Sequence, residues 1–153
     1  ASSAGDDRLL LVSNANDNSS HLSVTITPTS ATSKILLTTS IFFEGSNTSM
    51  HEYLWCLYRD TTKLGQPRVG SRRGGIASTG INYGNAADAT STPDITAFSF
   101  LDAPSTTSQI TYAVAFNHSS NSGNLFLNRT VNDADSIAYE RGVSIIIAQE
   151  IAQ

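Results

Sequence analysis

Residues 21–43 read HLSVTITPTSATSKILLTTSIFF, two segments of alternating apolar and polar residues separated by a proline-containing turn. The first segment places its apolar residues on one face, which predicts a half-buried strand that ends at Pro28. The second segment, 34–43, carries apolar residues on both faces, so part of this strand is expected to be buried on both sides. The residues expected to face the core are Leu22, Val24, Ile26, Ile35, Leu37, Ile41 and Phe43.

The same alternation recurs along the rest of the chain, where turn-forming residues separate short apolar segments. Further strands are expected at residues 8–12, 53–58, 63–65, 95–101, 110–116, 125–127 and 142–151. About eight short strands predict an all-β protein, an antiparallel β-sandwich. A single domain is expected at 21–153, with 1–20 as an N-terminal arm or a first strand. One helical turn is expected near 136–140, and Trp55 and Tyr112 are assigned to the core.

The composition excludes several classes of function. Charged residues make up only 14% of the 153 residues, against about 25% in an average protein. Ser, Thr and Asn together supply 50 residues, and the net charge is −4. A nucleic-acid partner is not expected, because general binders are basic. Membrane insertion is not expected either, since no apolar run approaches about 20 residues. The single cysteine, Cys56, excludes an internal disulfide and is expected to be a buried, inert thiol.

One segment interrupts the rhythm of strands. Residues 65–94 contain six glycines and few apolar residues, and a loop of this length is usually functional. The alternative is that the segment holds irregular strands, and a strand near its middle is indicated by Ile76, Ile81 and Tyr83. Its positive charge is concentrated in three arginines, Arg68, Arg72 and Arg73. They are consistent with an anion contact, a solvated loop tip or an ion pair between subunits, and the subunit contact is ranked slightly above the ligand contact.

Motifs for catalysis or metal binding are not found. The three histidines, His21, His51 and His118, belong to no metalloprotease motif, and neither a nucleophile elbow nor a phosphate-binding loop occurs. We therefore expect no enzyme and no cofactor. Asp133 and Asp135 are a weak candidate for calcium, although an Asx-rich turn is the preferred interpretation. Tyr83 and Tyr139 are the tyrosines expected to make exposed contacts.

Several blocks of the chain are similar to a known family. They are LSVTITPTSATSKILL (22–37), LYRDTTKLG (57–65), FSFLDAPSTTS (98–108), TY (111–112), LNRT (127–130) and VSIIIAQEIA (143–152). In this order they resemble SITPTSATSKILV, LYRDSTxIG, SFLDSPSTTS, TTYKV, INR and STITAMEIA of tail-fibre and virion surface domains from bacteriophages, many of them marine. The resemblance covers nearly the whole chain, and no catalytic motif belongs to it.

The resemblance implies a terminal module of a trimeric fibre, with a jelly-roll similar to the tumour-necrosis-factor and C1q-like trimers. The implied partners are further copies of the chain, other virion proteins and a glycan or protein of the bacterial surface, and the implied location is the extracellular virion surface. The candidate receptor contacts lie in the 65–94 and 117–123 loops: Arg68, Arg72, Arg73, Tyr83, Asn117 and His118. A capsid decoration or cement protein is the alternative, and an enzyme that degrades surface polysaccharide is a third hypothesis.

Overall fold

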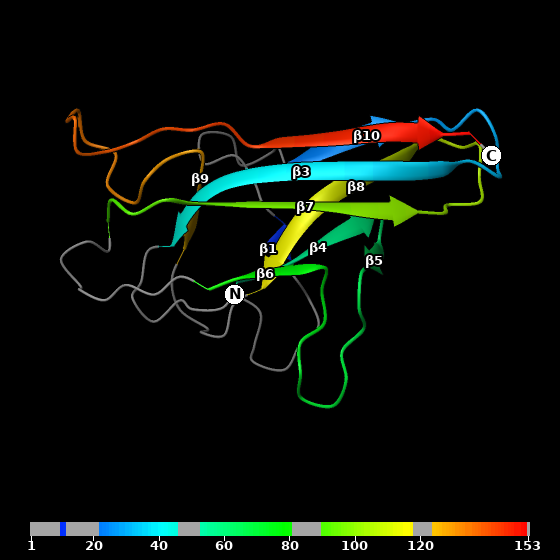
Figure 1. The fold of residues 1–153 in the computed structure, drawn as a ribbon, viewed down its shortest axis with the longest axis horizontal. Helices are drawn as coiled ribbons and strands as arrows, with labels where there is room; N and C mark the ends of the chain where they lie inside the picture. Colours follow the sequence, from blue (N-terminus) through cyan, green and yellow to red (C-terminus); the bar gives the residue numbers. More distant parts are fainter. Residues whose placement is uncertain (1–9, 12–21, 46–52, 81–89, 118–123, 153) are drawn as a thin grey trace.

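The computed structural model describes residues 10–11, 22–45, 53–80, 90–117 and 124–152. Within these ranges the chain forms ten β-strands and no helix, and the strands make two antiparallel sheets (Figure 1). The predicted all-β antiparallel sandwich is therefore confirmed. Nowhere in the described ranges is there a helix with the length and apolarity needed to cross a membrane.

The first sheet has the order β1-β8-β4-β5, with β2 paired to β8 and β6 paired to β4. Its strands are β1 (Leu10–Leu11), β2 (Ser23–Ile26), β4 (Tyr53–Arg59), β5 (Thr62–Leu64), β6 (Ala77–Thr79) and β8 (Ile110–Asn117). The second sheet has the order β10-β3-β7, with β9 paired to β3. Its strands are β3 (Lys34–Gly45), β7 (Asp94–Asp102), β9 (Leu125–Leu127) and β10 (Ile145–Ile151).

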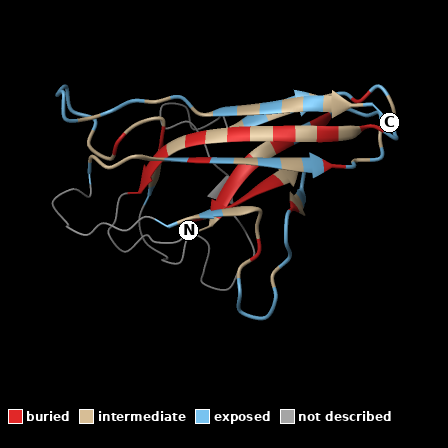
Figure 2. Cartoon of the chain, in the orientation of Figure 1, coloured by how far each residue is buried: buried red, intermediate tan, exposed pale blue. Residues whose placement is uncertain are grey.

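The core lies between the two sheets and is built from the inward residues of β3, β4 and β8. Figure 2 shows the alternation directly, because buried and half-buried residues follow one another along β3. The large buried side chains are Ile35, Leu37, Ile41, Phe43, Tyr53, Trp55, Leu57, Ile110 and Tyr112. Phe43 packs edge-on against Trp55 with ring centroids 4.8 Å apart, an arrangement that aromatic quadrupoles favour. The assignment of Trp55 and Tyr112 to the core is thus confirmed.

One local expectation is corrected. Residues 136–140 form no helix: the amide of Tyr139 donates to the Ser136 carbonyl at 3.2 Å, which closes a simple turn. For the segment 65–94, the structure agrees with the alternative that it holds short strands, since residues 65–76 form a hairpin-like excursion and β6 follows directly. Of the expected opening strand, Leu10 and Leu11 pair with β8, and the rest of residues 1–20 lies outside the described ranges.

Cys56 is expected to react with alkylating reagents only when the protein unfolds. Its side chain is fully buried on β4 beside Ala115. Burial raises the pKa of the thiol from 9.0 to about 12, and the nearby Lys63 charge offsets only part of this shift. The thiolate is the reactive form of cysteine. Burial therefore protects Cys56 in two ways, because it shields the sulfur from reagents and keeps the thiol protonated. Iodoacetamide labelling followed by mass spectrometry should show no reaction in buffer and full reaction in denaturant; rapid labelling of the folded chain would contradict this assignment.

Candidate functional site

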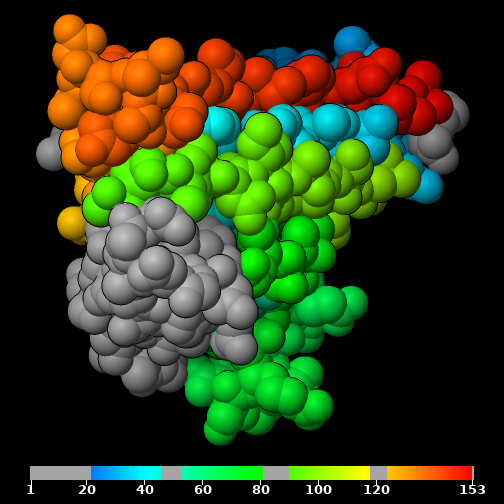
Figure 3. All heavy atoms as spheres, turned by 60° about the vertical axis from the view of Figure 1, so that its left-hand side comes forward, coloured from blue at the N-terminus to red at the C-terminus, as the bar shows by residue number. Residues whose placement is uncertain are grey.

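The outward side of the second sheet exposes several large apolar side chains. In the register of β10, β3 and β7, Ile145 pairs with Ser40, which in turn pairs with Ala97, and the two following rows along β10 also mix apolar and uncharged polar residues. We call this surface the outer face. Its residues are Lys34, Leu36, Thr38, Ser40, Phe42, Ile95, Ala97, Ser99, Leu101, Ile145, Ile147, Gln149 and Ile151. In Figure 3 the three strands run as adjacent bands along one side of the molecule.

The outer face combines high exposure with almost no charge. Ile147, Leu101 and Ile95 are 51%, 52% and 59% exposed, and Val143, next to β10, reaches 77%. Lys34, at the end of the sheet, is the only charged residue among those listed for the outer face. Protein interfaces are depleted of charge at their centres, and a contiguous exposed apolar patch commonly marks one. The arrangement therefore suits a face that another protein surface covers.

A second feature is the excursion between β5 and β6, which we call the basic hairpin (residues 65–76). Val69 and Arg72 exchange two backbone hydrogen bonds of 3.2 and 3.1 Å, which close a two-residue turn. Gly70 takes the first turn position with a φ of +59°, a conformation that favours glycine. The base of the basic hairpin is held by a bond from the Gln66 amide to the Gly75 carbonyl. It projects away from both sheets (Figures 1 and 3).

The basic hairpin brings together four of the six candidate receptor contacts. Arg68 donates its Nε–H to the Gly70 carbonyl at 2.9 Å, and Arg72 donates its own to the Val69 carbonyl at 3.4 Å. Arg73 donates from Nη1 to Oδ1 of Asn117 at 2.9 Å, so these two candidates touch although 44 residues separate them. The remaining two candidates, Tyr83 and His118, lie outside the described residues, as do His21 and His51.

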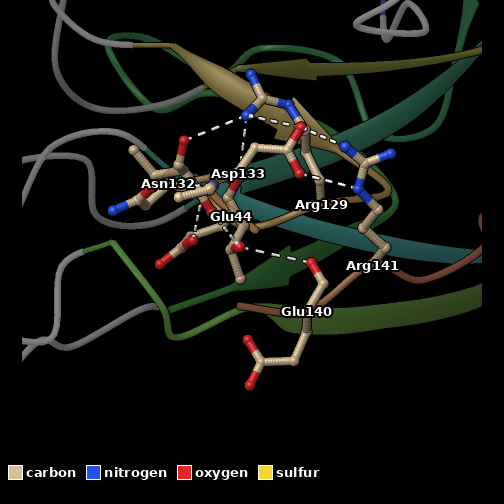
Figure 4. Close-up of polar contacts among 9 residues, drawn as sticks. Glu44, Arg129, Asn132, Asp133, Glu140 and Arg141 are labelled. Carbon is tan, nitrogen blue, oxygen red and sulfur yellow. Dashed lines mark hydrogen bonds and ion pairs between the residues drawn. The ribbon is translucent and has the colours of Figure 1, made fainter. Parts of the chain in front are cut away.

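At the weak calcium candidate, the Asp133 carboxylate is paired with the guanidinium of Arg141. Oδ1 and Oδ2 of Asp133 accept hydrogen bonds of 2.9 and 2.6 Å from Arg141, and Arg129 lies 3.9 Å from Oδ2 (Figure 4). Asp135 is exposed in the adjoining turn. Because the Arg141 guanidinium donates to both oxygens, the Asp133 carboxylate is already engaged in an ion pair. In the described part of the chain, no three carboxylate, histidine or cysteine side chains gather where they could hold a metal ion.

Glu44 is a fully buried carboxylate that joins two loops. Its Oε1 accepts hydrogen bonds from the Thr92 amide at 2.7 Å and the Thr92 hydroxyl at 3.3 Å, and its Oε2 accepts one from the Val131 amide at 2.6 Å. These donors come from the segment before β7 and the segment after β9. Figure 4 shows the Glu44 carboxylate beneath Asp133, whereas the carboxylate of Glu140 turns away. No sequence pattern indicates this site, because its main donors are backbone amides of distant residues.

The blocks that carry the family resemblance contact one another through three further acidic residues. Asp102 of FSFLDAPSTTS accepts two hydrogen bonds from Arg59 of LYRDTTKLG, at 3.1 and 2.9 Å. Glu150 of the last block accepts bonds of 2.8 and 2.9 Å from the amide and hydroxyl of Thr29 in the first block. Asp60 accepts the amide of Thr111 at 3.0 Å. These motif residues therefore act as links within the scaffold.

The Glu150 link keeps that carboxylate ionised. A hydrogen bond from the Ser33 hydroxyl, together with those from Thr29 and Ser30, holds the pKa of Glu150 below its usual value of 4.5 against a smaller opposing effect of desolvation. Hydrogen bonds to the charged form favour that form. The turn between β2 and β3 is therefore fastened to the last strand at neutral pH.

Tyr112 is expected to make the protein less stable in strong alkali. Its hydroxyl donates to Oδ2 of Asp102 at 2.7 Å inside the core, and burial followed by this hydrogen bond raises the pKa of Tyr112 above its usual 10. A raised pKa in the folded state gives stability that is complete below about pH 10 and is lost as the pH rises further. Urea unfolding at about pH 8 and about pH 11 should show this decline. The Tyr112→Phe variant should decline less, and an equal decline in both proteins would refute the assignment.

Comparisons with protein-family models, with curated proteins and with solved structures found no match to this chain.

Proposed function

We propose that the chain is a homotrimeric surface module of a bacteriophage virion, of the fibre-tip type, that binds a receptor on the host cell. The outer face is the observation that carries this proposal. It is apolar, nearly free of charge and borne by β10, β3 and β7. The resemblance to phage fibre and virion surface domains supplies the biological setting, which fits a surface rich in Ser, Thr and Asn.

The proposed occupant of the outer face is a second copy of the chain. Apolar and hydroxyl side chains are mixed across the face, so two copies of the chain would present chemically similar surfaces to each other. Because Lys34 is the one charged residue listed for the outer face, the face exerts little electrostatic attraction on a charged partner. Homo-oligomers close most often by cyclic symmetry, and an assembly around this face would also shield the edges of the sheet.

Receptor binding is proposed for the projecting basic hairpin, which a trimer would present three times. Three weak contacts gain avidity without a deep pocket. The test is adsorption of the domain, labelled at its N-terminus, to a panel of bacteria while phage infection is scored in parallel. Saturable binding that blocks infection supports the proposal. Absence of cell binding, with uptake onto phage shells instead, would overturn it in favour of a capsid decoration protein.

A further inference from the structure

The chain distributes its charge unevenly. Residues 61–87 contain four of the nine basic residues, Lys63, Arg68, Arg72 and Arg73, and none of the thirteen acidic ones. The rest of the chain is accordingly more acidic than the net charge of −4 indicates. Charge of one sign on a projecting element produces a local potential that attracts the opposite sign.

The geometry of the basic hairpin concentrates this charge further. The bridge between Val69 and Arg72 brings the two arms together, so that Arg68 and Arg72 lie on opposite arms of the basic hairpin. Like charges on neighbouring strands repel one another, and an anion placed between them would relieve this repulsion. The Nε bonds of Arg68 and Arg72 to the turn carbonyls restrain both guanidinium groups beside the tip.

We infer that the basic hairpin binds an anionic polysaccharide, whose carboxylate or sulfate groups contact Arg68 and Arg72. This inference rests on the proposed receptor function and names its ligand class. Guanidinium groups match carboxylate and sulfate oxygens with paired hydrogen bonds. The side-chain amide of Asn117, which accepts a hydrogen bond from Arg73, lies beside the cationic site. This amide offers hydrogen-bonding partners to the hydroxyl groups of a sugar. A repeating anionic polymer also suits a site that an oligomer presents several times.

The test measures binding of three probes to the full chain: heparin fragments, polygalacturonate and neutral dextran. Heparin carries sulfate and carboxylate groups, polygalacturonate carries carboxylate alone, and dextran carries no charge. We expect binding of at least one anionic probe, none of dextran, and weaker binding at higher salt. The variant R68Q/R72Q should weaken binding at least tenfold.

The matched control is R141Q, because Arg141 is an exposed arginine outside the basic hairpin. It should change binding less than twofold. Equal losses in R68Q/R72Q and R141Q, or absence of binding to both anionic probes, would overturn the inference. The oligomeric mass is measured on the same samples. An unchanged trimer without polyanion binding defeats only this inference, whereas a monomer that binds the polyanion defeats the proposed assembly. A mass that falls in R68Q/R72Q would assign the basic hairpin to a subunit contact instead.

Discussion

The Glu44→Gln variant is expected to lose about 3 kcal/mol of unfolding free energy, a large fraction of the stability of a single domain. Both carboxylate oxygens of Glu44 accept backbone amides, Oε1 from Thr92 and Oε2 from Val131. Glutamine has one oxygen and one NH2 group, so either orientation sets a donor against a donor. The buried amide facing the NH2 group then loses its acceptor, and the remaining bond is no longer assisted by charge.

The measurement is urea unfolding followed by the fluorescence of Trp55, which is fully buried in the core. Glu140→Gln is the matched control, since Glu140 is exposed and its carboxylate turns away from the cluster (Figure 4). We expect the control to lie within about 0.5 kcal/mol of the wild type. Hydrogen exchange should also accelerate at the amides of Thr92 and Val131. A variant as stable as the control would show that Glu44 does not hold these loops.

The Ile147→Asp variant is expected to convert the proposed trimer to a monomer without unfolding the subunit. Ile147 lies in the middle row of the outer face, where it pairs with Thr38 of β3, which in turn pairs with Ser99 of β7. It is 51% exposed in the isolated chain. An aspartate there would become buried without a partner in every subunit of the assembly, which is costly. In the monomer the same side chain stays in water, so the unfolding free energy of the subunit should change by about 0.5 kcal/mol or less.

Light scattering coupled to size-exclusion chromatography measures this change. Ile137→Asp is the matched control, because Ile137 is fully exposed in the turn after β9 and does not belong to the outer face. The Ile137→Asp variant should leave the proposed trimer intact. In the adsorption experiment, the monomeric Ile147→Asp variant should bind cells at least tenfold more weakly, because avidity is lost. A trimer that survives Ile147→Asp would place the subunit interface elsewhere.

Alternation in the sequence was sufficient to predict most strands and the inward residues of β3 and β4. Each apolar residue at spacing two marks a face, and the side chains of Phe43 and Trp55 lie where this pattern placed them. The last strand was harder, because Ile145, Ile146 and Ile147 are apolar on both faces. Only its pairing with β3 shows that Ile146 points inward and its two neighbours point outward.

The sequence contains a local signal for the basic hairpin. Gly70 and Ser71 between Val69 and Arg72 form a two-residue turn with glycine first, a known hairpin signature. The long stretch of small residues around it obscured the pairing. The contact between Arg73 and Asn117 joins the basic hairpin to the end of β8, and no local pattern indicates it because 44 residues separate the two.

Sequence patterns do not predict the contacts of the buried carboxylates. Glu44 continues the strand that begins at Lys34, and its partners Thr92 and Val131 are 48 and 87 residues away. They contribute backbone amides, which every residue except proline possesses, so their side chains give no indication of the contact. Asp102 differs, because its partner is the side chain of Arg59, but their separation of 43 residues likewise leaves no local pattern.

The most direct test of the proposed assembly is the mass of the wild-type chain in solution, measured by sedimentation equilibrium over a wide range of concentrations. Burial of the outer face predicts a stable species of three times the 16.3 kDa chain mass. A species that remains at 16.3 kDa at every concentration would show that the outer face is not a subunit interface and would contradict the proposed trimeric module.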